Sequence, residues 1–158
     1  MSLRNLVKVQ FFHSPGQKIK MNRVINILLV EDDILDAMDL QRTLDRMRIL
    51  YKMKIAKNGE EGLLLLEQPD HPLFTCKPDI ILLDMNMPRM NGIEFLQTLR
   101  SSDEWKNIKV FVLTTSDESE DERIMRSLGI SGYITKPLKM SNTRSIDAFN
   151  LMIDLMNM

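Results

Sequence analysis

Residues 78–88 read PDIILLDMNMP, and this stretch decides the fold. Four aliphatic residues in a row, Ile80 to Leu83, end directly at Asp84. An apolar run without polar alternation is typical of a strand buried on both faces, as in a parallel sheet. A proline and an Asn-Gly pair then mark a loop before the next helix. We therefore expect a central strand with Asp84 at its carboxyl end, where open α/β sheets bind their ligands.

The rest of the chain repeats this unit of a buried strand followed by an amphipathic helix. Apolar runs predict four further strands, and apolar residues three or four positions apart predict the helices between them. Strict alternation implies a parallel sheet with right-handed crossovers and helices on both faces. The predicted strands are 24–30, 51–56, 79–84, 109–114 and 133–135, and the predicted helices are 34–48, 60–68, 92–101, 118–128 and 142–157.

Residues 1–22 differ from the rest of the chain. Residues 6–12 alternate as a strand does, and the sequence His-Ser-Pro-Gly then breaks the pattern. Two interpretations stay open. The segment is a tag or an upstream extension, with Met21 as the natural start, or it is an extra edge strand or an interface arm. Either way, we expect a single domain over residues 23–158 behind it.

Composition limits the function. A formal net charge of −1 over 158 residues gives no electrostatic case for nucleic acid or an anionic membrane. No apolar run approaches the length of a membrane span. The single cysteine, Cys76, excludes an intrachain disulfide and a cysteine-based metal cluster, and it suits a cytoplasmic protein.

Four of the predicted strands end in polar residues. Glu31 and Asp32 follow the first strand, and Asp84 ends the third. Thr115 and Lys136 follow the fourth and fifth strands. Each of these alone is more typical of a helix cap or a solvated side chain. If the strand order is 2-1-3-4-5, however, the first and third strands are neighbours, and the three carboxylates converge on one crevice.

Three converging carboxylates repel one another, and a divalent cation resolves the conflict. Carboxylates without histidine or cysteine nearby favour Mg²⁺, or Mn²⁺ in its place, over zinc. Mg²⁺ in turn suggests phosphoryl chemistry. Asp84 could then be a nucleophile that forms an aspartyl-phosphate. Lys136 would neutralise one phosphoryl oxygen, and the Thr115 hydroxyl would donate a hydrogen bond to another.

Four motifs, in this order, resemble those of the receiver domain of two-component response regulators. They are LLVEDD at 28–33, LDMNMPRMNG at 83–92, LTTS at 113–116 and GYITKP at 132–137. The resemblance covers about residues 24–157. It implies a flavodoxin-like, doubly wound (βα)5 fold with a five-stranded parallel sheet in the order 2-1-3-4-5. The third and fourth motifs look most like the stand-alone regulators paired with phytochrome-type and other hybrid kinases.

The resemblance also implies a role for each carboxylate. Asp84 is the phosphoacceptor, and Glu31 and Asp32 are the acidic pair that holds Mg²⁺ together with Asp84. The backbone carbonyl of Asn86 completes the protein ligands. The first acidic residue is glutamate where the family more often has aspartate, and this exchange leaves Mg²⁺ binding intact.

The same resemblance assigns the switch residues and the partners. Thr115 is the switch hydroxyl, Lys136 pairs with the phosphoryl group, and a cis bond joins Lys136 to Pro137. Tyr133 is the aromatic side chain that turns inward on activation. A sensor histidine kinase or a phosphotransfer protein supplies the phosphoryl group. Output passes through the surface of the fourth helix, fifth strand and fifth helix, and a homodimer is left open.

Two other functions are open to these residues. A Mg²⁺-dependent phosphohydrolase with an aspartyl-phosphate intermediate would carry a second aspartate two residues after the nucleophile, where this chain has Asn86. A degenerate receiver would bind partners without being phosphorylated, but this chain has every expected site residue. We therefore predict a stand-alone switch without turnover of an independent substrate.

Overall fold

The computed structural model describes residues 7–8, 23–47, 49–68, 77–115, 120–137 and 143–157. Each predicted strand and helix is present, with both ends within two residues of the expected positions. The strands are β1 (Val7–Lys8), β2 (Ile25–Val30), β3 (Tyr51–Ala56), β4 (Ile80–Asp84), β5 (Lys109–Thr114) and β6 (Gly132–Thr135). The helices are α1 (Ile34–Arg46), α2 (Gly59–Glu67), α3 (Gly92–Ser101), α4 (Glu120–Ser127) and α5 (Thr143–Asn157).

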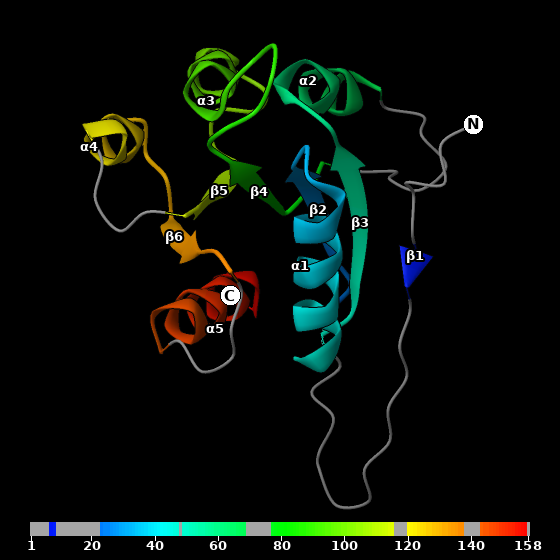
Figure 1. The fold of residues 1–158 in the computed structure, drawn as a ribbon. Helices are drawn as coiled ribbons and strands as arrows, with labels where there is room; N and C mark the ends of the chain where they lie inside the picture. Colours follow the sequence, from blue (N-terminus) through cyan, green and yellow to red (C-terminus); the bar gives the residue numbers. More distant parts are fainter. Residues whose placement is uncertain are drawn as a thin grey trace, which may run out of the picture.

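The strands form one sheet in the order β1-β3-β2-β4-β5-β6 (Figure 1). The five predicted strands are β2 to β6, and their order β3-β2-β4-β5-β6 is the expected order 2-1-3-4-5. All pairs among them are parallel, which confirms the doubly wound, flavodoxin-like fold. The sheet has one strand more than the five expected, because β1 pairs antiparallel with β3. An edge strand was one of the interpretations left open for residues 1–22. The other residues of this segment lie outside the described part of the chain.

Helices cover both faces of the sheet, with α1 and α5 on one side and α2, α3 and α4 on the other (Figure 1). Successive side chains of a strand point to opposite faces, so each face has its own core. Ile27 and Leu29 of β2 pack with Leu40 of α1, whereas Leu28 packs with Phe95 of α3. The apolar run of β4 is fully buried, as its lack of alternation predicted. Its end is therefore fixed firmly in the middle of the sheet.

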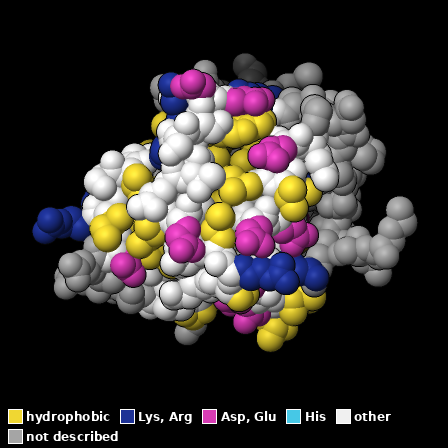
Figure 2. Space-filling model, turned by 90° about the horizontal axis from the view of Figure 1, so that it is seen from above, with side chains coloured by type: hydrophobic (Ala, Val, Ile, Leu, Met, Phe, Trp, Pro, Cys, Tyr) yellow, Lys and Arg dark blue, Asp and Glu magenta, His cyan; other side chains and the backbone are white. Residues whose placement is uncertain are grey.

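The face formed by α2 and α3 shows hydrophobic side chains at its surface (Figure 2). The sequence of α2 explains part of this, because residues 63–66 are four leucines in a row. Consecutive helical residues point in different directions, so the run cannot be buried completely. Leu66 is 7% exposed, whereas Leu64 is 57% exposed. Among the described residues, no helix combines the length and the apolar character that a membrane crossing requires.

Candidate functional site

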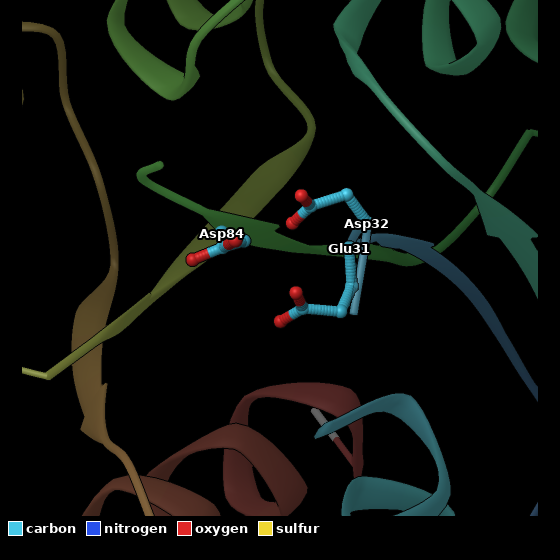
Figure 3. A group of neighbouring side chains, drawn as sticks. All are labelled: Glu31, Asp32 and Asp84. Carbon is cyan, nitrogen blue, oxygen red and sulfur yellow. The ribbon is translucent and has the colours of Figure 1, made fainter. Parts of the chain in front are cut away.

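The carboxyl ends of β2 and β4 lie side by side and bring three carboxylates together. Val30 pairs with Leu83, so the residues that follow them share one edge of the sheet. One oxygen from each of Glu31, Asp32 and Asp84 lies within 4.8 Å of the others, and the side chains point toward one another (Figure 3). Glu31 and Asp84 are buried, and Asp32 is exposed. The convergence predicted from the strand order is therefore present.

Lys136 places a cation in this cluster. It follows β6, and its side chain is only 10% exposed. Its Nζ atom lies 2.6 Å from Glu31 Oε2 and 3.3 Å from Asp84 Oδ1. It also donates a 2.8 Å hydrogen bond to Oδ2 of Asp36, a residue of α1. One ammonium group thus contacts three carboxylates, and the Asp84 carboxylate is the most distant of them.

The start of α3 packs closely against the end of β4. The N–H of Gly92 donates to the carbonyl of Met85, and a Cβ on Gly92 would lie 2.8 Å from the carbonyl oxygen of Asp84. Glycine is therefore required there by the close approach of the two backbones. Asn91 caps the helix by accepting from the N–H of Glu94, and the Glu94 carboxylate accepts from the N–H of Asn91. This reciprocal capping box fixes the loop beyond Asp84.

Burial makes the carboxylates hard to ionise in the absence of a cation. Burial raises the pKa of Glu31 to about 7, the Lys136 ammonium opposes this rise, and the charge of Asp84 adds to it. Burial also raises the pKa of Asp84, and Lys136 offsets part of that rise. Burial alone would lower the pKa of Lys136, but the carboxylates of Asp36 and Glu31 outweigh it and raise the pKa. The cluster therefore stabilises positive charge.

The donor set fits a hard divalent cation. All candidate ligand atoms are carboxylate oxygens, the ligand type that Mg²⁺ and Mn²⁺ prefer. Oε2 of Glu31 is buried, and the Lys136 ammonium lies 2.6 Å from it. A carboxylate oxygen carries two lone pairs, so this oxygen can bind a metal ion beside the ammonium or in its place.

The structure places the other predicted site residues around this cluster. Thr115 lies directly after β5 and is exposed. Asn86 is exposed, and its backbone N–H bonds to the Asp84 carboxylate, while the role of its carbonyl stays a prediction. The bond between Lys136 and Pro137 is cis, as expected. Thr115 and Asn86 thus follow the ends of β5 and β4, which are neighbours in the sheet.

Tyr133 contacts α4 in this structure. Its hydroxyl donates a 2.8 Å hydrogen bond to the carbonyl of Glu122. The guanidinium of Arg126 lies 5.4 Å from the centre of the ring. Burial raises the pKa of Tyr133 to about 12, with Glu122 adding to the rise, so the phenol remains a hydrogen-bond donor. The structure shows this one position of the ring, and its movement stays a prediction.

Sequence reasoning missed Asp36. This residue lies in the first turn of α1, three positions after the N-cap Asp33. An acidic residue at that position is ordinarily explained by the helix cap or the helix dipole. The one feature of the sequence that pointed to Asp36 is its position in the first turn of the helix that starts at the site. Whether its side chain turns toward the cap or toward the site depends on the fold.

Comparison with known proteins agrees with this geometry. The family model described as the response regulator receiver domain matches residues 27–146. The response regulator Rcp1 of a Synechocystis strain is 34% identical over 110 residues, which are 70% of this chain and 75% of Rcp1.

Solved structures of response regulators also align with most of this chain. The Mn²⁺-bound form of Rcp1 aligns with a TM-score of 0.62 and 29% identity, over 82% of this chain and 91% of that one. The bacteriophytochrome response regulator AtBRR aligns with a TM-score of 0.71 and 29% identity, over 86% and 95% of the two chains. The phosphorylated cyanobacterial phytochrome response regulator RcpA aligns with a TM-score of 0.65 and 28% identity, over 84% and 91%.

Proposed function

Because the chain belongs to the response regulator receiver domain family, we propose that it is a signalling switch that accepts a phosphoryl group on Asp84. As a receiver it takes part in two-component signalling. The observation that carries the proposal is the buried Asp84, which lies between an acidic pair and a buried lysine. This arrangement has a nucleophile, a place for a divalent cation and a fixed positive charge in one crevice.

Glu31, Asp32 and Asp84 would hold the divalent cation, and we propose Mg²⁺, with Mn²⁺ as a substitute. The Asn86 carbonyl would be a further ligand. When bound, the cation supplies charge neutralisation for the phosphoryl oxygens. The Mn²⁺-bound form of the relative Rcp1 supports a divalent cation in this family.

The transfer step uses residues of this chain for positioning. A carboxylate oxygen of Asp84 forms a bond to phosphorus, and the phosphorus–nitrogen bond of a phosphohistidine breaks. The electron pair of that bond stays on the imidazole nitrogen. The donor is a sensor histidine kinase or a phosphotransfer protein. Lys136, already 3.3 Å from Asp84 Oδ1, pairs with a phosphoryl oxygen without a large movement.

The new charge of roughly −1.5 to −2 changes which contacts are favourable around Asp84. We propose that Thr115 turns toward the phosphoryl group and that Tyr133 leaves Glu122 to follow it. The surface of α4, β6 and α5 then changes its affinity for a partner, or for a second copy of this chain. The phosphorylated form of the relative RcpA supports such a switch, and the phytochrome-associated relatives make a phytochrome-type kinase our preferred partner. A cytoplasmic location stays a prediction.

The test is the intact mass of the protein after incubation with a small phosphodonor, with and without Mg²⁺. We expect wild type to gain one phosphoryl group only with Mg²⁺, and Asp84→Asn to gain none. Asp39→Asn is the matched control, because it removes an exposed carboxylate of α1 and should leave the adduct unchanged. An equal adduct on Asp84→Asn would refute the assignment. Turnover of small phosphomonoesters would favour the phosphohydrolase instead.

A further inference from the structure

Asp36 offers the Lys136 ammonium a carboxylate that does not belong to the proposed cation site. The hydrogen bond from Nζ to Asp36 Oδ2 is 2.8 Å long, whereas the one to Asp84 Oδ1 is 3.3 Å. The side chain of Asp36 is 40% exposed, so it remains hydrated while it binds the ammonium. A carboxylate that stays partly in water keeps its charge at lower cost than a buried one. Asp36 is therefore a lasting partner for Lys136.

The two helix starts beside the site explain why Asp36 is available. In α3 the acidic residue three positions after the N-cap, Glu94, turns back and accepts from the N–H of the N-cap residue Asn91. In α1 the corresponding donor, the N–H of Asp33, goes to Oε1 of Glu31 instead. The acidic residue at the equivalent place in α1 is Asp36. Its side chain is not needed by the cap and turns to Lys136.

These contacts form a closed ring. Glu31 accepts from the N–H of Asp33, and Oδ1 of Asp33 accepts from the N–H groups of Leu35 and Asp36. Asp36 accepts from Lys136, and Lys136 returns to Glu31 through the 2.6 Å ion pair. The position of the Asp36 carboxylate is thus fixed by the first turn of α1. It acts on the ammonium from a rigid helix start and not from a mobile loop.

We propose that Asp36 is a positioning residue that holds Lys136 and so keeps Glu31 and Asp84 available to the divalent cation. The inference rests on the proposed cation site. Lys136 and the cation compete for the same two buried carboxylates. Because Asp36 neutralises part of the ammonium charge, Lys136 attracts Glu31 and Asp84 less strongly. Without the charge of Asp36, Lys136 binds these two carboxylates more tightly, and the cation must displace it.

The experiment is calorimetric titration of the metal-free full chain with Mg²⁺ at 0.15 M salt. We expect Asp36→Asn to raise the Kd of Mg²⁺ about threefold to fivefold, the size of one partly exposed ion pair. Asp39→Asn is the matched control, because it neutralises an exposed carboxylate one turn further along α1 that pairs with Arg42 and not with Lys136. Asp36→Ser is a second neutral variant if the amide perturbs the helix start, and unfolding curves check that each variant is folded.

A double-mutant cycle with Lys136→Met decides whether Asp36 acts through the lysine. In the Lys136→Met background, the effect of Asp36→Asn should shrink to that of Asp39→Asn. An undiminished effect there would mean simple charge attraction and would overturn the inference. So would an unchanged Kd in Asp36→Asn. If wild type itself binds no Mg²⁺, the proposed function fails first, which distinguishes the two failures.

Discussion

Lys136 and Arg100 are both partly buried cations, but they lie at opposite ends of the parallel strands and have different partners. Lys136 follows β6 at the carboxyl end, and within the described residues its ammonium pairs with the carboxylates of Glu31, Asp36 and Asp84. Arg100, near the end of α3, lies at the amino end, where the chain enters β5 and β6. Its guanidinium donates to four backbone carbonyls at 2.8–3.0 Å, those of Lys106, Ile108, Leu128 and Gly129.

Because of this difference in partners, the contacts of Arg100 are fixed, whereas those of Lys136 can change. Two of the carbonyls around Arg100, those of Leu128 and Gly129, directly follow α4, where a helix leaves acceptors without intrahelical donors. The other two, those of Lys106 and Ile108, lie in the segment between α3 and β5. Burial lowers the pKa of Arg100, yet an arginine keeps its charge at physiological pH. Carboxylates, in contrast, can take a proton, a metal ion or a phosphoryl group. A partly buried cation therefore stabilises the fold at one end of the sheet and can change partners at the other.

The largest effect is expected from Arg100→Met. The variant leaves four carbonyls without their donor, of which those of Ile108 and Leu128 are partly buried, and we expect a loss of about 4 kcal/mol in the free energy of unfolding. Urea denaturation at pH 5 and pH 8 measures it, and the loss should be equal at both because no partner titrates. Arg100→Lys should recover less than half, since an ammonium lacks the planar fork. A loss that depends on pH would contradict this comparison.

The second largest effect is a pH dependence of the stability of the wild type, and it comes from the carboxyl end of the strands. Glu31 has a pKa of about 7 in the folded state, against an ordinary value of 4.5. Between these values the folded protein retains a proton that the unfolded chain loses, so stability falls as the pH rises. The full difference corresponds to about 3 kcal/mol, and the raised pKa of Asp84 acts in the same direction.

Urea midpoints of the metal-free protein from pH 4.5 to 8 measure this fall. Glu31→Gln should remove most of it, because the amide carries no titrating proton. Saturating Mg²⁺ should also reverse it in the wild type if the cation binds the ionised carboxylates. A flat profile, or a profile that Glu31→Gln does not change, would show that the buried glutamate is not the source.

These two ends of the sheet also differ in how well the sequence predicted them. The carboxylates were predictable because apolar runs locate the strands, and a polar residue at the end of a buried strand has only one edge of the sheet to occupy. Arg100 gave no such signal, because an arginine in the last turn of a helix is usually an exposed partner of the helix dipole. Its function as a donor to the end of α4 and to the segment before β5 depends on how α3 packs beside α4.

The remaining gaps have equally local causes. Asp36 could not be assigned because its direction depends on where the N–H of Asp33 goes, and that is decided by the nearby Glu31. The paired part of β1 is two residues long, too short for its alternation to distinguish a strand from an extended tail. The contact between Tyr133 and α4 follows from tertiary packing, which periodicity does not report.

The smallest effect is expected from Lys136→Met, and it tests the changeable end directly. Removal of the ammonium leaves Glu31, Asp36 and Asp84 without their shared cation, and at pH 8 we expect a loss of about 2 kcal/mol in the free energy of unfolding. The loss is smaller than that of Arg100→Met because the carboxylates can bind protons when the lysine is missing. Denaturation at pH 5 should therefore show almost no difference from the wild type.

Mg²⁺ should act on this variant as a proton does. It replaces the missing positive charge, so saturating Mg²⁺ should abolish the loss at pH 8, and the Kd for Mg²⁺ should be lower than in the wild type because Lys136 no longer competes. Arg100→Met should show neither change. If Lys136→Met instead lost the same stability at pH 5, at pH 8 and with Mg²⁺, Lys136 would be as fixed a structural cation as Arg100. The carboxylates around it would then not be free to exchange their partner.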